Sequence, residues 1–581
     1  MPSFSLSLLL PLLVASPTLS SVFPRQYNTT SQTPPTAQTK NGTYVGRYAS
    51  RWNTDYFLGM PYAQPPVGDL RFHTPMPLET YWNGSRNATE YGPECFGYGR
   101  DTWSQGNYVS EDCLTLNVVR SRGSGDRLPV LVWIHGGGLV MGGSADHRYN
   151  QTFMVQQSAE AGMPIVAVSI NYRLSSWGFL YGKEIQDSGN TMNGLRDQRL
   201  ALQWVQDNIA AFGGDPGRVT IQGESSGGTS VGAQLLAYDG RDDGLFSGAI
   251  AESGNPVGLN PYPTVEDWAP VIANISRETG CSNATNLLTC LRAVPTEKMN
   301  DVINSTATSG AAYGPVIDGD FIVDDAATQL QQGRFVSVPY LLGCNSDEGT
   351  GFGPQQINST QEVLDVLQEE EGFDMATAQD LAILYPDIPE IGVPASYPGR
   401  PNGTFGSRYK RTSAMFGDFS MHGPRRWTAM QWVKNGAQAY TYRFNVVVNG
   451  VPWTSGAVHF QEVAFVFYNT MGLGYPQNGN PNPLGGPQRE KYLEVSKLMS
   501  RMWISFVNFG NPNKQLGVEA ETWPAYSQQQ PQNFVFEQNI TSHAEPDYYR
   551  AEGIHYIGEL IAARHGRNCS GLEACGYNNT D

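Results

Sequence analysis

The sequence between positions 219 and 228 reads Val219-Thr220-Ile221-Gln222-Gly223-Glu224-Ser225-Ser226-Gly227-Gly228. A short β-branched run, typical of a strand, leads into Gly-x-Ser-x-Gly, and small residues that can wind as a helix follow. A very sharp turn at Ser225 requires residues without a Cβ two positions away on either side, as Gly223 and Gly227 are. The stretch therefore predicts strand, tight turn and helix, with the serine hydroxyl exposed at the turn. With 64 glycines in 581 residues, the pattern alone does not exclude an ordinary glycine-rich turn.

The composition is that of a globular protein with a sizeable core, 40% hydrophobic and 16% charged. The net charge of −17 argues against nucleic-acid binding, which requires a basic face. There is no basic patch for anionic membranes, and no segment after the first 20 residues has the length and apolarity of a membrane anchor. We expect a soluble, acidic protein.

The chain divides into four predicted parts. Residues 1–20 read as a secretory signal peptide, 21–40 as a disordered lead-in, 41–565 as a single catalytic domain and 566–581 as a C-terminal tail. Many Asn-x-Ser/Thr sequons favour a secreted, extracellular protein with N-linked glycans. They begin at Asn28, Asn41, Asn83, Asn87, Asn150, Asn274, Asn283, Asn304, Asn358, Asn402, Asn539, Asn568 and Asn578.

The seven cysteines also fit an exported protein. Six of them fall in close pairs, although six cysteines allow 15 connectivities and proximity is the only guide here. The pairs are Cys95/Cys113, Cys281/Cys290 and Cys569/Cys575. Cys344 lies among apolar neighbours and is expected to be a buried free thiol. No Cys-x-x-Cys occurs and the histidines are scattered, so we expect no zinc site and no cofactor.

Strands alternate with helices along the chain. Apolar runs without alternation, such as Leu128–Ile134, suit strands buried on both faces of a parallel sheet. Further strands are expected at 164–170, 219–222, 245–251, 338–343 and 439–448, and helices at 194–212, 226–238, 491–506 and 549–563. Helical segments at 360–385 and 411–435 form an insertion. This alternation predicts an α/β fold with a large, mostly parallel central sheet and helices on both faces.

A serine nucleophile needs a base, and that base needs an orienting acid. In α/β-hydrolases, whose nucleophile elbow the first motif matches, the chain order is Ser, acid, His. His459 is favoured because small, turn-prone residues surround it after a predicted strand, and His422 is the alternative. Asp347 and Glu348 both follow a buried strand, and spacing does not choose between them.

Several blocks resemble the type-B carboxylesterase/lipase family, which includes the cholinesterases and certain fungal lipases. They are Gly223-Glu224-Ser225-Ser226-Gly227, Trp133-Ile134-His135-Gly136-Gly137-Gly138, Ser110-Glu111-Asp112-Cys113-Leu114-Thr115-Leu116-Asn117, Gly194-Leu195-Arg196-Asp197-Gln198, Phe212-Gly213-Gly214-Asp215-Pro216 and Asp347-Glu348-Gly349-Thr350. Their common order covers roughly residues 40–565. The resemblance implies an α/β-hydrolase fold with a helical insertion before the catalytic histidine.

The resemblance also implies roles for single residues. Ser225 would be the nucleophile, Glu348 the acid and His459 the base. The backbone N–H groups of Gly137, Gly138 and Ser226 would form the oxyanion hole. Cys95–Cys113 and Cys281–Cys290 look like the family's disulfides. The implied activity is that of a carboxylic ester hydrolase, which acts on a small-molecule ester.

Two departures from the family pattern stand out. The residue after the nucleophile is commonly Ala and here is Ser226. The loop from Cys95 to Cys113 is shorter than the mobile lid of the family's true lipases. We therefore expect an esterase for short-to-medium acyl esters, with Phe96, Tyr98, Trp103 and Tyr108 as a fixed wall of the substrate pocket. The alternatives are a lipase or sterol esterase and, more remotely, a non-catalytic adhesion protein of the cholinesterase type.

Overall fold

A large sheet forms the centre of the computed structural model, which describes residues 33–101, 108–475 and 481–565. In spatial order its strands are β16 (His543–Pro546), β15 (Gln532–Phe536), β14 (Ala439–Phe444), β13 (Tyr340–Asn345), β12 (Gly248–Glu252), β11 (Gly214–Glu224), β9 (Leu128–Ile134), β10 (Val166–Ile170), β8 (Thr115–Ser121), β4 (Thr54–Pro61) and β3 (Arg47–Ala49). Neighbouring strands from β10 to β15 are parallel, whereas β16 at one edge and β8, β4 and β3 at the other pair antiparallel.

Strand β9 shows why the apolar runs become central strands. All seven of its residues are buried. Val130 and Val132 join one hydrophobic core, and Leu131 and Trp133 join a second one. Successive side chains of a strand point to opposite faces, so the sheet lies between two cores and needs helices on both sides.

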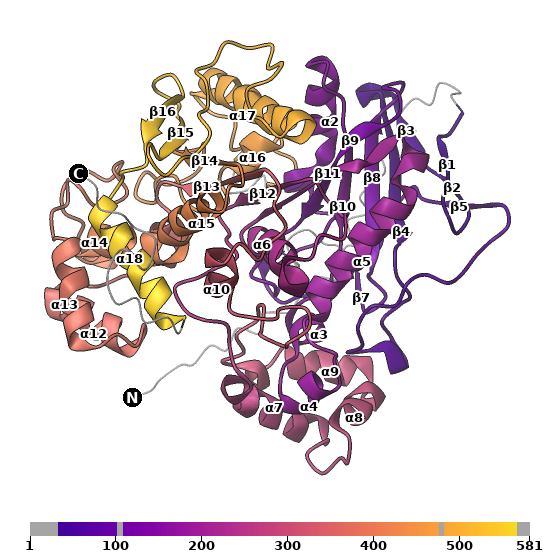
Figure 1. Ribbon diagram of the computed structural model, residues 1–581, viewed down its shortest axis with the longest axis horizontal. Helices are drawn as coiled ribbons and strands as arrows, with labels where there is room; N and C mark the ends of the chain where they lie inside the picture. Colours follow the sequence, from indigo (N-terminus) through magenta and orange to yellow (C-terminus); the bar gives the residue numbers. More distant parts are fainter. Residues whose placement is uncertain (1–32, 102–107, 476–480, 566–581) are drawn as a thin grey trace, which may run out of the picture. The chain divides into compact units, whose positions relative to one another are not determined.

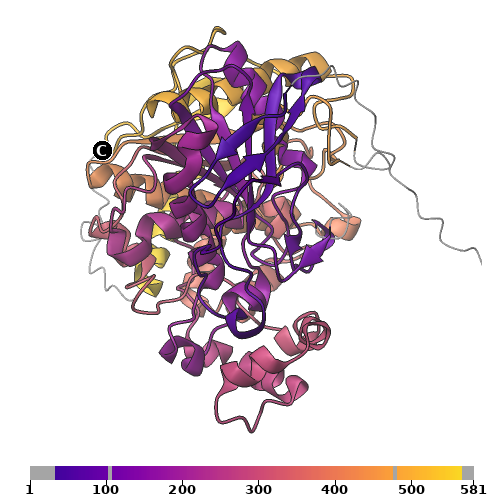
Figure 2. The ribbon, with the colours of Figure 1, turned by 90° about the vertical axis from the view of Figure 1, so that its right-hand side faces the viewer.

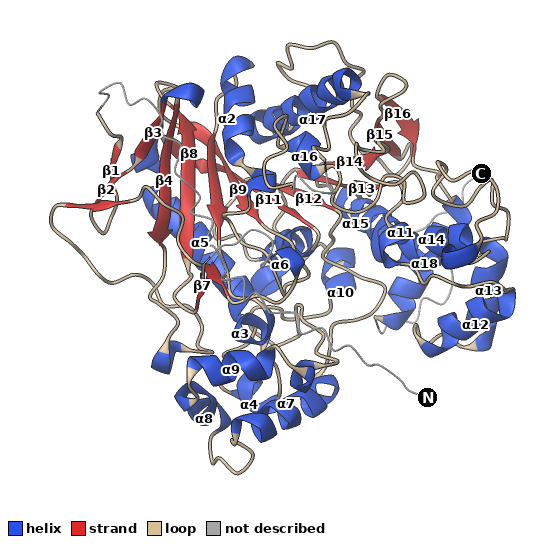
Figure 3. Ribbon diagram, turned by 180° about the vertical axis from the view of Figure 1, so that it is seen from behind, coloured by secondary structure: helices blue, strands red, loops and turns tan. Residues whose placement is uncertain are grey.

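Two helical layers supply that cover (Figures 1 and 3). On one face lie α2 (Gln151–Glu160), α16 (Val463–Val466) and α17 (Arg489–Phe509). On the other lie α5 (Asn193–Asn208), α6 (Ser226–Gly240), α10 (Ala326–Gln331), α15 (Gly423–Lys434) and α18 (Ala551–Arg564). The predicted α/β class, with a mostly parallel sheet between helices, is confirmed.

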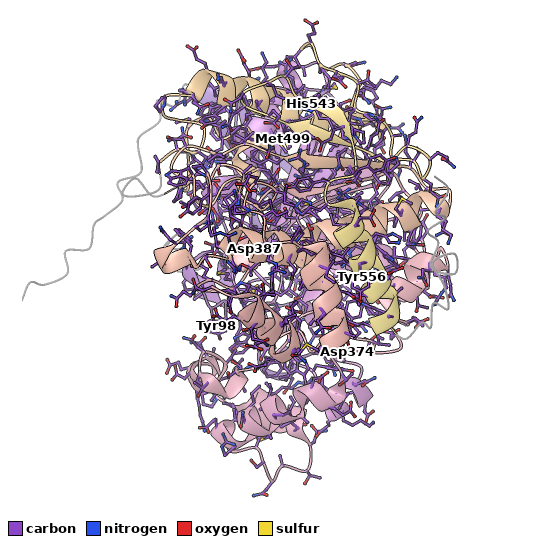
Figure 4. All side chains as sticks on the ribbon, turned by 90° about the vertical axis from the view of Figure 1, so that its left-hand side faces the viewer. Tyr98, Asp374, Asp387, Met499, His543 and Tyr556 are labelled. Atoms are coloured by element: carbon purple, nitrogen blue, oxygen red, sulfur yellow. A yellow bond between two sulfur atoms is a disulfide. The ribbon has the colours of Figure 1, made fainter. Side chains whose placement is uncertain are left out.

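Two further groups of helices lie outside these layers. The first contains α3 (Ser175–Phe179), α4 (Lys183–Asp187), α7 (Val265–Thr279), α8 (Leu287–Ala293) and α9 (Thr296–Ile303); α7 to α9 are the pink helices at the bottom of Figure 2. The second is the insertion between β13 and β14, with α11 (Gly349–Phe352), α12 (Thr360–Glu369), α13 (Met375–Leu384) and α14 (Tyr409–Gly417). In Figure 4, Tyr556 of α18 lies beside the helix that begins after Asp374.

Short strands complete the described chain. β1 (Thr36–Gln38), β2 (Thr43–Val45) and β5 (Ser85–Asn87) form a small sheet, and β6 (Glu94–Cys95) pairs with β7 (Val109–Ser110). Within the described ranges, no helix combines the length and apolarity needed to cross a bilayer. The predicted signal peptide and C-terminal tail fall outside the described residues. The prediction of a disordered lead-in over 21–40 is wrong at its end, because β1 pairs with β2 there and buries Ala37.

The boundaries of the predicted elements differ from the structure in a few places. The helix predicted to reach Phe212 is an α-helix only to Asn208 and continues as a 3-10 turn over Ile209–Phe212. The strand predicted over 219–222 is longer in the structure. β11 begins at Gly214, which pairs with Leu128 of β9, and regular pairing with β9 resumes at Val219. Neither difference moves the turn at Ser225.

Candidate active site

The turn at Ser225 joins β11 to α6. Ser225 has φ 57° and ψ −126°, a strained conformation for a residue with a Cβ. A Cβ on Gly223 would lie 2.4 Å from the carbonyl carbon of Gly227, and one on Gly227 would lie 2.2 Å from the Ile134 carbonyl oxygen. Both glycines are therefore required by close approach of the backbone, as the motif predicted.

The structure brings together Ser225, His459 and Glu348 from three loops. His459 follows β14, and its Nε2 lies 2.9 Å from Ser225 Oγ. Its Nδ1 lies 2.8 Å from Glu348 Oε2, and Glu348 follows β13. The carboxyl ends of neighbouring parallel strands lie at one edge of a sheet, which is why residues so distant in sequence meet.

The alternatives left open by the sequence lie elsewhere. Asp347 accepts a hydrogen bond from the Ala457 N–H at 2.7 Å and so fastens the loop that carries His459. His422 is buried, with its Nδ1 3.2 Å from the Sγ of Cys344. Cys344 is a buried free thiol, as expected.

Glu348 is held in place by two donors on one oxygen. The Ser253 hydroxyl donates to Glu348 Oε1 at 2.5 Å, and the Asn345 N–H donates to the same atom at 2.8 Å. The side chain of Glu348 is fully buried. Its other oxygen remains for His459, which fixes the orientation of the ring and places the proton on Nδ1.

Sequence reasoning missed three further carboxyl groups beside the triad. Glu224 Oε1 lies 3.3 Å from His459 Nε2, and Glu462 Oε2 accepts a hydrogen bond from Asn345 Nδ2 at 2.6 Å. Glu252 accepts one from Trp503 Nε1 at 2.8 Å. The signals available were that Glu224 directly precedes the serine and that Glu462 lies three residues after the histidine.

Burial and repulsion from other carboxylates raise the pKa of each of these three carboxyl groups, so each binds a proton at a higher pH than an exposed glutamate does. Burial is the main cause in each case. It raises the pKa of Glu252 to about 8 and the pKa of Glu462 to about 7, with added repulsion from Glu462 and Glu348 respectively. It also raises the pKa of Glu224 well above its usual range, although His459 opposes the shift.

His459 experiences the opposite balance. Burial lowers its pKa, but the charges of Glu348 and Glu224 outweigh burial and raise the pKa to about 10. The ring is also in edge-on contact with Phe352, at 4.9 Å between centroids, and Phe352 is 44% exposed. The imidazole thus lies between a buried cluster of carboxyl groups and a partly exposed aromatic ring.

The glycine loop after β9 lies against the turn at Ser225. β9 and β11 are neighbours, with Ile134 opposite Gly223. A Cβ on Gly136 would lie 2.4 Å from the Glu224 carbonyl oxygen, so the two loops touch through their backbones. Gly137 and Gly138 have φ angles of 104° and 64°. Their N–H groups and that of Ser226, at the start of α6, are the candidate oxyanion donors.

The loop between Cys95 and Cys113 is closed by a disulfide, and a second disulfide joins Cys281 to Cys290. The Tyr98 hydroxyl accepts from Trp177 Nε1 and donates to Asn300 Oδ1 of α9, both at 2.8 Å. In Figure 4, Tyr98 is labelled next to the group of helices that contains α9.

The other residues of the predicted wall differ from one another. Phe96 stacks on Trp177, at 5.3 Å between centroids, whereas Tyr108 is 74% exposed. Trp103 and the predicted pair Cys569/Cys575 lie outside the described residues.

Comparisons with known proteins agree with these features. A family model described as "Carboxylesterase family" matches residues 33–552. The chain is 35% identical to Lipase 4 of Diutina rugosa over 505 residues, which covers 78% of this chain and 88% of the lipase. It is 33% identical to the cholinesterase of Mus musculus, covering 81% of this chain and 77% of that protein. The crystal structure of Aspergillus niger EstA matches with a TM-score of 0.77 and 28% identity, over 92% of this chain and 99% of that one.

Proposed function

Since this chain belongs to the carboxylesterase family and is a carboxylic ester hydrolase of the α/β-hydrolase fold, we propose that it cleaves esters through Ser225, His459 and Glu348 by way of an acyl-enzyme. The observation that carries the proposal is the unbroken chain of contacts from Ser225 Oγ through both nitrogens of His459 to Glu348, at 2.9 and 2.8 Å. The small-molecule ester is the only partner that the reaction requires besides water.

The reaction takes place in two halves. In the first, Ser225 Oγ bonds to the acyl carbon while its proton passes to His459 Nε2. That proton then goes to the leaving alcohol as the ester C–O bond breaks. In the second half, water attacks the acyl-enzyme, His459 takes the water proton, and Ser225 Oγ leaves with a proton from His459. Glu348 stabilises the imidazolium in both halves.

The negative charge on the carbonyl oxygen needs donors that are already in place. The backbone N–H groups of Gly137, Gly138 and Ser226 fit this role because the glycine loop lies against the turn at Ser225 and α6 begins directly after that residue. Gly137 and Gly138 have positive φ angles and no Cβ atoms, so the loop that they form can approach a bound substrate closely.

We favour soluble short-to-medium acyl esters as substrates. The part of the Cys95–Cys113 loop around Phe96 and Tyr98 is fixed by stacking and hydrogen bonds rather than free to open. A lipase or sterol esterase activity is the second candidate, because Lipase 4 of Diutina rugosa covers most of the chain. Hydrolysis of esters with increasing acyl length separates the two.

We further propose that the catalytic domain of residues 41–565 is secreted after removal of residues 1–20. Two disulfides support an oxidising compartment. Several sequon asparagines are exposed and available for glycans, namely Asn83, Asn87, Asn283, Asn304, Asn358, Asn402 and Asn539. Asn41 is not among them, since it is buried and its Nδ2 donates to the Leu78 carbonyl at 3.0 Å.

The test is an active-site titration with a chromogenic ester. We expect a burst of one alcohol per chain, followed by slower turnover, and acylation of Ser225 alone in the trapped enzyme. Ser225→Ala should lose both burst and turnover while the thermal melt stays within a few degrees, because Ser225 is half-buried and its side chain carries little packing. Hydrolysis by Ser225→Ala within tenfold of the parent rate would reject the assignment.

A further inference from the structure

Three consecutive residues of the glycine loop have positive φ angles. Gly137, Gly138 and Leu139 have φ values of 104°, 64° and 60°. Glycine adopts such angles freely, but Leu139 does so only under strain, because its Cβ crowds the backbone. Leu139 therefore has to be held by its surroundings. It directly follows the two candidate oxyanion donors, so whatever holds it also shapes the loop that presents them.

The side chain of Ser226 is one of the groups that hold Leu139. The Leu139 N–H donates to Ser226 Oγ at 3.1 Å. On its other side, the Leu139 carbonyl accepts from the Ser175 N–H at 2.6 Å. Ser226 is also the first residue of α6 and carries the third candidate donor on its own backbone. Its hydroxyl thus ties the two halves of the candidate oxyanion hole to each other.

Ser226 is also connected to the other end of the glycine loop. Tyr172 is fully buried, its ring stacks on His135 at 4.4 Å between centroids, and its hydroxyl donates to the His135 carbonyl at 2.6 Å. Burial raises the pKa of Tyr172, and the polar side chain of Ser226 nearby opposes that shift. Ser226 therefore contacts Leu139 directly and lies near Tyr172, which holds His135 at the start of the loop.

We propose that Ser226 is a positioning residue for ester hydrolysis: its side-chain hydroxyl fixes the glycine loop so that the N–H groups of Gly137, Gly138 and Ser226 converge on the developing oxyanion. This inference rests on the proposed function. An alanine at position 226 would keep the backbone N–H but leave the Leu139 N–H without this acceptor. A more mobile loop has to be reordered as the transition state forms. Donors that are already in place avoid this cost.

The experiment compares Ser226→Ala with Ser230→Ala in the full chain. Ser230 lies one turn further along α6, is 1% exposed, and accepts a hydrogen bond from Gln198 Nε2 at 3.0 Å. Both variants lose one serine hydroxyl of the same helix, half-buried at Ser226 and buried at Ser230, but only Ser226 donates or accepts a hydrogen bond with the glycine loop. We would measure kcat and KM on a soluble ester, Ki for a trifluoromethyl ketone that forms an oxyanion adduct with serine, and the thermal melt.

In Ser226→Ala we expect kcat to fall about tenfold, which is less than the 10²–10³ that follows loss of a whole donor, because all three N–H groups remain. KM should stay within about twofold, and Ki should rise by about the same factor as kcat falls, since only interactions of the transition state are lost. Ser230→Ala should change none of these constants beyond about twofold.

Two results would overturn the positioning role. One is a kcat of Ser226→Ala within twofold of the parent value. The other is an equal rise of KM and Ki, which would mean that the hydroxyl only supports general binding or folding. Either result, with an inactive Ser225→Ala, rejects this inference alone. Residual hydrolysis by Ser225→Ala would instead reject the proposed function.

Discussion

Replacing Glu224 by Gln should move the acid limb of the activity profile to lower pH. As general base, His459 must be neutral, so activity rises with pH through its pKa in the free enzyme. That pKa lies above the usual value because the charges of Glu348 and Glu224 outweigh burial. Glutamine keeps the shape of Glu224 but removes its charge, which makes the imidazolium less stable and lowers the pKa of His459.

The size of the shift follows from one distance. Unit charges 3.3 Å apart, as between Glu224 Oε1 and His459 Nε2, attract by about 5 kcal/mol at an effective dielectric constant of about 20. At about 1.4 kcal/mol per pKa unit, this is an upper bound of 3 to 4 units. Burial raises the pKa of Glu224 itself, so it carries only part of that charge. We therefore expect the acid limb to fall by roughly one unit or more.

The assay measures kcat/KM for a soluble short-chain ester at pH values between about 5 and 10. Each reaction is monitored by titrating the released acid. Glu370→Gln is a matched control, since Glu370 is an exposed carboxylate of the helical insertion. It removes the same charge from the chain without touching His459. An acid limb in Glu224→Gln that stays where the parent has it, or moves upward, would refute the electrostatic reasoning.

Three further predictions test the triad, the loop and the disulfide. His459→Ala should lower kcat by at least about 10³-fold, whereas His422→Ala should leave it largely intact; kinetics at alkaline pH check both, and swapped outcomes would make His422 the base. The rate on a short-chain ester should saturate smoothly with concentration, and a sharp rise at the solubility limit would indicate a working lid. Replacing Cys95 and Cys113 together by Ala should lower the free energy of unfolding, measured by denaturant titration, by about 3 kcal/mol. The disulfide links residues 18 positions apart, and without it the unfolded chain gains the conformational freedom of that loop.

The sequence was most informative where a motif has one geometric solution. Gly223 and Gly227 predicted the turn at Ser225 because any Cβ there would collide with backbone. The choice between Asp347 and Glu348 needed the family resemblance, since both follow β13 and both are buried. What separates them is the return of the loop after β14, which offers an N–H of Ala457 to Asp347 and the ring of His459 to Glu348.

The cluster of carboxyl groups could not be predicted for a related reason. Glu224, Glu252 and Glu462 come from β11, β12 and the loop before α16, up to 238 positions apart in the numbering (462 − 224). Each is an ordinary surface residue type, and their burial depends on how the ends of two strands and a distant loop meet. The hydrogen bond between Leu139 and Ser226 was equally hidden, because it joins loops 87 residues apart.

The crowding around Ser225 also bears on attempts to diversify the enzyme. A Cβ on Gly254 would lie 2.2 Å from the Ser225 carbonyl oxygen, which adds this glycine to the backbone contacts of Gly136, Gly223 and Gly227. Libraries that randomise these four glycine positions would consist mostly of inactive variants, whatever substrate is used for selection. Gly351 differs, since a Cβ there would meet only Val458 Cγ2, at 3.4 Å. Mutational search for new substrates is therefore better directed at Gly351 than at the glycines that give the fold its catalytic turn, or at Gly349, whose Cβ would lie 1.9 Å from the Ser413 carbonyl oxygen.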